Sequence, residues 1–413
     1  MKKFLALMLA LVMVFALAAC GDGGSTPSDS AQPSDSVSPS ESDQPSESPS
    51  ESEEPSESPS ESEPAAPAGD YKVAMITDSG DITDQSFNQT TYEACKEYCE
   101  GAGVDFKYYK PAGNSDADRE GAIEQAIMEG YNIIVVPGYL FGPALQNVVP
   151  TYPDAKFVAL DVSAGDLGDM GNAVPDNLYC AIYQEELCGY MAGYAAVKLG
   201  YTKLGFLGGM SVPAVQRYGY GYVQGADAAA KELGNTGDVS VNYIYAGQFF
   251  GDADVTARMD TWYSTNNTEI VFACGGGVYT SAAEAAAKAG GKVIGVDVDQ
   301  AGIIDAYGAG MTVTSAMKGL AATVKDTLKD TIENDNWSKY AGQVATLGLV
   351  SGDDPEANYV QIPMGTTQWA DGFTQDDYKA LVKDMFDGKI SVSNDISAEP
   401  ATEIAVDYQG SVK

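Results

Sequence analysis

From Tyr71 onward, short apolar runs alternate with longer segments in which apolar residues recur at helical spacing. The short runs have strand length and are bounded by turn-forming residues. We therefore expect strands at 72–78, 104–109, 133–136, 156–161, 179–183, 203–207, 239–245, 269–273 and 292–297. We expect helices at 84–99 with Asp84 as its cap, at 115–129 and 185–199, before Gly234, and at 252–263 and 281–289.

This strand–helix alternation predicts parallel sheets that are covered by helices on both faces. The strands fall into two series that divide near residue 200. Two series of four or five strands favour two doubly wound lobes over one large sheet. The sequence therefore predicts an α/β fold with two lobes.

Polar residues and glycines follow the predicted strands, where ligands of open α/β sheets bind. Asp78, Asp161 and Asp297 each end a strand, and other strands end in Pro137-Gly138, Gly208-Gly209 and Gly275-Gly276-Gly277. Phe87 and Asn88 fall in the first turn of the first helix, beside the same cleft. The alternatives are that the aspartates cap the following helices and that Phe87 packs in the core. Three aspartates in equivalent places favour a polar cleft.

The residues before the folded part predict a lipid anchor and a tether. Lys2 and Lys3 precede an apolar stretch at 4–17, which ends in Leu17-Ala18-Ala19-Cys20. This order is typical of a lipoprotein signal peptide at 1–19 with lipidation of Cys20. Residues 20–69 are rich in Ser, Pro, Glu and Asp and carry no Lys, Arg or aromatic residue, which predicts a disordered tether. We expect a protein anchored to the outer face of the cell membrane by its lipid alone.

Composition excludes several classes of function. The net charge of −36 argues against nucleic acid as a partner. The chain has no His, so catalysis by Ser-His-Asp or Cys-His groups is excluded. Five Cys remain after Cys20, and this odd number argues against a complete disulfide framework. We expect no cofactor and no metal.

Several motifs together resemble the basic membrane protein family, also called PnrA-like nucleoside-binding lipoproteins. The segment 84–89 is similar to the family's DxSFNQ signature. Further similar segments, in order, are YPDAKF at 152–157, ELCGYMAG at 186–193, GVDVDQ at 295–300 and TSAMK at 314–318.

The resemblance implies a periplasmic-binding-protein type I fold with a three-strand hinge. Its lobes are expected at 70–200 plus 302–342 and at 201–301 plus 343–413. It implies a monomer that delivers a purine nucleoside to the permease subunits of an ABC importer. The implied site has Phe87 and Phe249 stacking on the base, and Asn88, Asp78 and Asp161 at its polar edges, with Asp297, Lys318 and the backbone of Gly276 at the ribose.

Alternatives remain at this point. The segment around Gln248 departs from the family pattern, so Phe250 is the alternative stacking residue. A sugar or another small solute is the alternative ligand, and a surface receptor without a transport role is the alternative function. An enzyme such as a nucleoside hydrolase is disfavoured, because the aspartates are spread over separate strand ends rather than clustered for a cation.

Overall fold

The computed structural model describes residues 70–413. The expected signal peptide, Cys20 and tether lie outside the described residues. No helix within residues 70–413 has the length and apolar character needed to cross a membrane.

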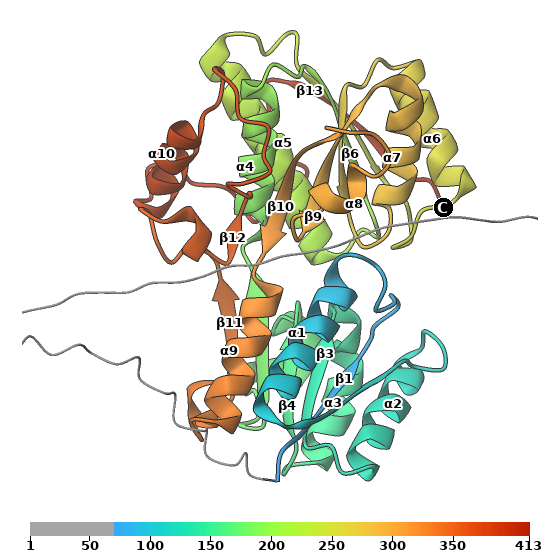
Figure 1. Cartoon of the computed structure of the whole chain (residues 1–413), viewed down its shortest axis with the longest axis vertical. Coiled ribbons are helices and arrows are strands. Elements are labelled where there is room, and N and C mark those ends of the chain that lie inside the picture. The colour runs from blue at the N-terminus through green and yellow to red at the C-terminus, as the bar shows by residue number, and fades with distance from the viewer. Residues whose placement is uncertain (1–69) are drawn as a thin grey trace, which may run out of the picture. The chain divides into compact units, whose positions relative to one another are not determined.

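The described chain forms two sheets, each covered by helices (Figure 1). The first sheet is entirely parallel, in the order β11-β5-β4-β3-β1-β2. Its strands are β1 Lys72–Ile76, β2 Asp105–Tyr109, β3 Ile133–Pro137, β4 Lys156–Leu160, β5 Leu178–Tyr183 and β11 Gln343–Leu347. Its helices are α1 Phe87–Ala102, α2 Asp116–Met128, α3 Gly142–Thr151 and α9 Leu320–Ile332.

The second sheet has the order β12-β10-β9-β8-β6-β7-β13, and only β12 runs antiparallel to its neighbour. Its strands are β6 Lys203–Gly208, β7 Ser240–Tyr245, β8 Ile270–Cys274, β9 Lys292–Asp297, β10 Thr312–Lys318, β12 Val360–Gln361 and β13 Ala405–Ser411. Its helices are α4 Glu185–Lys198, α5 Pro213–Leu233, α6 Ala253–Ser264, α7 Tyr279–Ala289, α8 Ala301–Ile304 and α10 Gln375–Phe386. The predicted pair of doubly wound lobes is confirmed.

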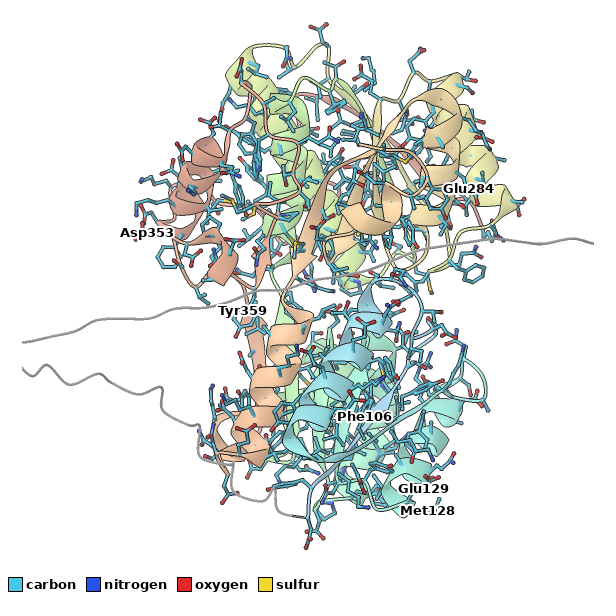
Figure 2. All side chains as sticks on the ribbon, viewed as in Figure 1. Phe106, Met128, Glu129, Glu284, Asp353 and Tyr359 are labelled. Carbon is cyan, nitrogen blue, oxygen red and sulfur yellow. The ribbon has the colours of Figure 1, made fainter. Side chains whose placement is uncertain are left out.

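Alternation along the strands explains why helices cover both faces of each sheet. In β1, Val73 and Met75 pack in the core on the α1 and α9 side. Ala74 and Ile76 belong to a separate core with α2 and α3. Successive strand residues point to opposite faces, so a strand that is apolar at every position requires cover on both. Figure 2 shows side chains filling the space between the sheets and their helices, while Met128 and Glu129 lie at the far end of the first lobe.

The lobes divide the chain differently from the expected boundaries. The chain passes from one lobe to the other after β5, after β10 and after β11, because β10 pairs with β9 whereas β11 pairs with β5. Helix α4 packs on α5 and so joins the second lobe, although residues up to 200 were expected in the first. Strand pairing across space decides the lobe of a segment, and the order of elements along the chain does not reveal it.

Four glycines let α4 and α5 approach with their backbones in contact. A Cβ at any of these positions would lie 2.0–2.2 Å from a carbonyl oxygen of the other helix: Gly189, Gly193, Gly221 and Gly225. The spacing is four residues in each helix, which places both glycines of a helix on one face. Helix α4 starts directly after the first interlobe crossover. Its close packing on α5 therefore holds the second-lobe end of that crossover in position.

We expect Gly193→Ala to lower the free energy of unfolding by about 1–3 kcal/mol, because the backbone it meets cannot move aside as a side chain can. The matched control is Gly121→Ala in α2, where an added Cβ meets nothing within 4 Å. That control should raise the free energy of unfolding by about 0.5–1 kcal/mol through its better helix propensity. Urea unfolding of the full chain measures both, and equal effects of the two variants would contradict the close packing.

Candidate ligand-binding site

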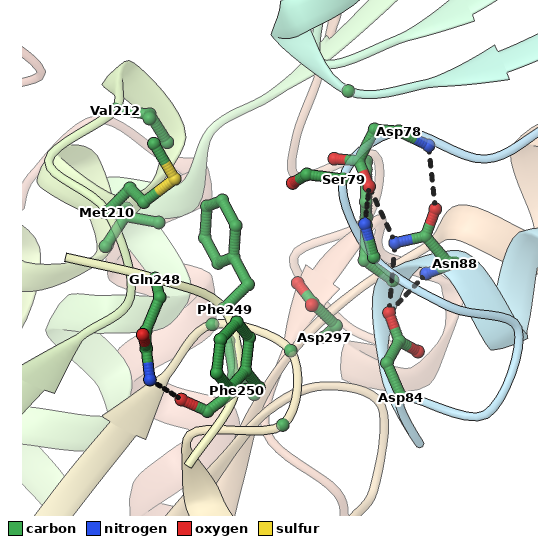
Figure 3. A pocket seen from close by; sticks show the side chains of 18 of the residues that line it. Asp78, Ser79, Asp84, Asn88, Met210, Val212, Gln248, Phe249, Phe250 and Asp297 are labelled. Atoms are coloured by element: carbon green, nitrogen blue, oxygen red, sulfur yellow. Dashed lines mark hydrogen bonds between the residues drawn. The ribbon is translucent and has the colours of Figure 1, made fainter. Parts of the chain in front are cut away.

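A cavity of about 650 Å³ lies between the two lobes. Residues of both lobes line it, and they include all eight positions singled out from the sequence: Asp78, Phe87, Asn88, Asp161, Phe249, Gly276, Asp297 and Lys318. Figure 3 shows the polar group Asp78, Asn88 and Asp84 on one side, and the apolar side chains Phe249, Phe250, Met210 and Val212 on the other. The cavity therefore has a polar wall and an apolar wall.

The charged residues reach the cavity because parallel strands end there. Asp297 and Lys318 end the neighbouring strands β9 and β10, and Asp161 directly follows β4 of the other lobe. Asp161 and Asp297 have left-handed backbone conformations, with φ of 58° and 65°. Such conformations are unfavourable for residues with a Cβ and are concentrated at functional sites. These turns aim both carboxylates at the interlobe space.

Lys318 forms the electrostatic centre of the site. Its Nζ lies 2.5 Å from Asp161, 3.6 Å from Asp297 and 3.6 Å from Glu185, and all four side chains are buried. Burial alone lowers the pKa of Lys318, but the attraction of these carboxylates outweighs it and raises the pKa above its ordinary value. The lysine is therefore a permanent cation that connects the two lobes.

Glu185 and Arg217 support this centre and were missed by the sequence analysis. Arg217 Nε donates to the second oxygen of Glu185 at 2.6 Å. Burial raises the pKa of Glu185, and the neighbouring Arg217 opposes that rise. Both residues fall inside predicted helices, where a charged residue ordinarily faces solvent. The signal in the sequence was that Glu185 stands two residues after the end of the predicted crossing strand.

The aromatic residues offer flat surfaces to a ligand. Lys318 Nζ lies 4.6 Å from the ring centroid of Phe87, so the ammonium covers one face of that ring. Phe249 rests on glycines, since a Cβ on Gly209 would lie 2.5 Å from its ring. Phe250 is 59% exposed at the same cavity. Phe249 is thus held in place by its surroundings, whereas Phe250 is not.

Asn88 orients Asp78 rather than facing the cavity with free polar atoms. Its amide nitrogen donates to Asp78 at 3.0 Å and to Asp84 at 3.1 Å, and its oxygen accepts from the Asp78 N–H at 3.3 Å. Burial raises the pKa of Asp78 to about 6, against hydrogen bonds from Gly80 and Asn88 that lower it. Asp78 Oδ1 carries both of these bonds, and Oδ2 faces Gly138 at the cavity.

A second acceptor lies at the same edge of the first sheet, because Asp161 follows β4 and only β3 separates β4 from β1. Asp161 Oδ1 is buried and has no hydrogen-bond partner among the described residues. An unpartnered buried carboxylate oxygen costs about 1–3 kcal/mol or more. A ligand with N–H or O–H groups would satisfy it.

Two lobes with a ligand-sized cavity between them are typical of two-lobed solute-binding proteins. Residues 71–353 match the family described as ABC transporter substrate-binding protein PnrA-like, or Bmp. The chain belongs to this family, which consists of solute-binding proteins rather than enzymes. A small-molecule ligand and a transporter permease as partner follow from that membership.

Individual relatives agree with this assignment. The chain is 28% identical to the ABC transporter nucleoside-binding protein BmpA of Lactococcus lactis subsp. cremoris, over 78% of this chain and 89% of the relative. It is 27% identical to an uncharacterized lipoprotein of Pyrococcus abyssi, over 67% of each. A solute-binding protein of an ABC transporter system from Aeropyrum pernix K1 matches with a TM-score of 0.60 and 21% identity, over 78% of this chain and 87% of that one. The type I periplasmic-binding-protein fold is confirmed.

We expect the Asp78 carboxyl to titrate with a pKa of about 6 in the folded chain, well above its ordinary 3.8. Ionisation of Asp78 therefore opposes folding, and this cost develops as the pH rises from about 4 to about 6. Asn88→Ala should raise the pKa further, because it removes a donor that favours the ionised form. Carbon-13 NMR of the aspartate carboxyls measures this, with Asp78→Asn identifying the signal.

Asp118 provides the internal reference for this titration. Hydrogen bonds from Ser115 lower the pKa of Asp118 below its ordinary value. Titration of Asp78 at or below 4, or no response to Asn88→Ala, would show that burial does not dominate at this position.

Proposed function

We propose that the cavity binds a purine nucleoside and that the protein delivers it to the permease of an ABC importer, from the outer face of the cell membrane where Cys20 anchors it. The proposal is supported by the name of the Lactococcus lactis relative, which describes a nucleoside-binding protein. It is supported further by the chemistry of the cavity, where flat apolar surfaces and carboxylate acceptors occur together.

The observation that carries the proposal is the remaining hydrogen-bonding capacity of Asp297. An ionised carboxylate offers about four acceptor positions. Ser86 Oγ donates to Oδ2 at 2.5 Å and Tyr218 donates to Oδ1 at 3.3 Å, so two positions remain. A vicinal diol presents two O–H donors. The two ribose hydroxyls of a nucleoside would therefore donate to the two remaining acceptor positions of Asp297. The neighbouring Lys318 would donate to ribose oxygens.

The base fits the rest of the cavity. Phe87 lines the cavity from the first lobe, and Lys318 Nζ lies 4.6 Å from its ring centroid. Phe249 is the partner ring on the opposite wall, and an aromatic ring between the two would gain offset stacking beyond the burial of area. Asp78 Oδ2 and Asp161 Oδ1 are acceptors, which suits the N–H donors at the edge of a purine. Asn88 acts on the base indirectly, through Asp78.

We expect Asp297→Ala to weaken nucleoside binding at least tenfold, because both ribose hydroxyls lose their acceptor in a closed cleft. Binding of the free base, which lacks the ribose, should change little. Calorimetry with a purine nucleoside and its free base measures the two losses, and thermal unfolding checks that the variant is folded. Equal losses for both ligands would mean that Asp297 shapes the cleft without contacting ribose.

We expect Phe249→Ala to weaken nucleoside binding by about 1–3 kcal/mol, the range for an aromatic residue stacked on a base. Phe250→Ala is the matched control on the next residue and should change the affinity by less than about 0.5 kcal/mol, because its ring is largely in solvent. Calorimetry on both variants decides between the two rings. A larger loss for Phe250→Ala would assign the stacking to Phe250.

A further inference from the structure

Ser86 occupies a helix N-cap but does not cap the helix. It is the N-cap residue of α1, and its hydroxyl makes no hydrogen bond to the first-turn amides. Asp84 supplies that cap instead, because its carboxylate accepts from the N–H groups of Ser86, Asn88 and Gln89 at 2.9–3.0 Å. The hydroxyl of Ser86 is therefore free for another use.

The Ser86 hydroxyl forms a hydrogen bond with a residue of the other lobe. Ser86 is fully buried, and its Oγ donates to Asp297 Oδ2 at 2.5 Å. Ser86 belongs to the first lobe at the start of α1, whereas Asp297 ends β9 in the second. A hydrogen bond to an ionised acceptor is short and strong, and burial strengthens it.

A second interlobe bond lies beside the first. Gln300 Nε2 donates to the backbone oxygen of Gln85 at 3.0 Å. The buried Gln300 is held from its own side, because its Oε1 accepts from Val296 N–H at 2.9 Å and its N–H donates to Ser315 Oγ at 3.1 Å. Gln85 has a φ of 55°, so its backbone is strained at this contact. We call the bonds Ser86–Asp297 and Gln85–Gln300 the interlobe latch.

We propose that Ser86 is a positioning residue that fixes the Asp297 carboxylate as the lobes close and, with Gln300, holds the cleft shut over its ligand. This inference rests on the proposed function for the role of Asp297 toward ribose. The Asp297 carboxylate accepts the latch bond from Ser86 and is also the proposed acceptor for ribose. Closure of the lobes and recognition of ribose therefore depend on the same group. The latch bonds exist only when the lobes meet, so they slow ligand release rather than speed ligand entry.

The test compares two serine N-caps of the full chain. Ser86→Ala removes the latch bond but no cap, so the nucleoside dissociation rate constant should rise about 10- to 100-fold, the equivalent of one charged hydrogen bond. The association rate constant should stay within about threefold. The affinity for the free base should fall as well, because the same latch closes the cleft over it. The nucleoside should lose more, because it also loses the fixed position of its acceptor Asp297.

Ser115→Ala is the control, because Ser115 does cap α2 by accepting from Asp118 N–H at 3.2 Å. It should lower the melting temperature and leave both rate constants unchanged. Gln300→Glu, which keeps the acceptor for Val296 but removes the donor to Gln85, should also speed dissociation. Stopped-flow kinetics provides these numbers. Unchanged dissociation in Ser86→Ala, or equal losses for nucleoside and base, would overturn the proposal.

A readout without ligand separates failure of the latch from failure of the proposed function. Absence of nucleoside binding by the unaltered chain would contradict the proposed function alone. The latch is then tested by measuring the distance between two spin labels in the ligand-free protein. The labels are attached to cysteines introduced at Glu129 and Glu284, which lie on different lobes (Figure 2). Cys20 is replaced by Ser in this experiment, and the other five cysteines are buried. Ser86→Ala should shift the distances toward longer values, and identical distributions would overturn the latch.

Discussion

The burial of one ammonium group, that of Lys318, constrains the rest of the structure. A buried cation is stable only if carboxylates and further hydrogen bonds replace the water it loses. Here the carboxylates come from three separate segments: Asp161 from the first lobe, and Asp297 and Glu185 from the second. The lobes must therefore meet at Lys318, and the strand ends that carry these residues must converge there. The ligand cavity is the space left beside this ion cluster.

Other features of the fold support that convergence. Glu185 reaches the cluster because α4 begins immediately after the crossover from β5, and the glycine contacts with α5 hold α4 in place. Arg217 comes from α5 itself and balances Glu185. On the first lobe, Asp84 takes over the cap of α1 and releases Ser86 to meet Asp297.

The sequence predicted the fold class and the position of the cleft, because each strand is an apolar run whose end is marked by a polar residue or a glycine. Asp78, Asp161 and Asp297 follow apolar runs, and parallel strands bring such ends together. The lobe boundaries were not predictable in the same way, since the pairing of β10 with β9 and of β11 with β5 depends on contacts distant in sequence. Glu185 and Arg217 fall inside predicted helices, where charged residues ordinarily face solvent, so the sequence did not single them out. The role of Asn88 also differs in detail, because only the structure shows that both its N–H groups are already used by Asp78 and Asp84.

The central claim is that an Asp297–Lys318 pair recognises ribose while two aromatic walls recognise the base, so both halves of a nucleoside are needed for tight binding. Isothermal titration calorimetry of the full chain against purine nucleosides, free bases, ribose and hexoses tests this directly. The account predicts that a purine nucleoside binds at least about 100-fold more tightly than its free base or ribose alone, since each lacks one set of contacts. Binding of a hexose as tightly as a nucleoside, or of free base as tightly as its nucleoside, would contradict it.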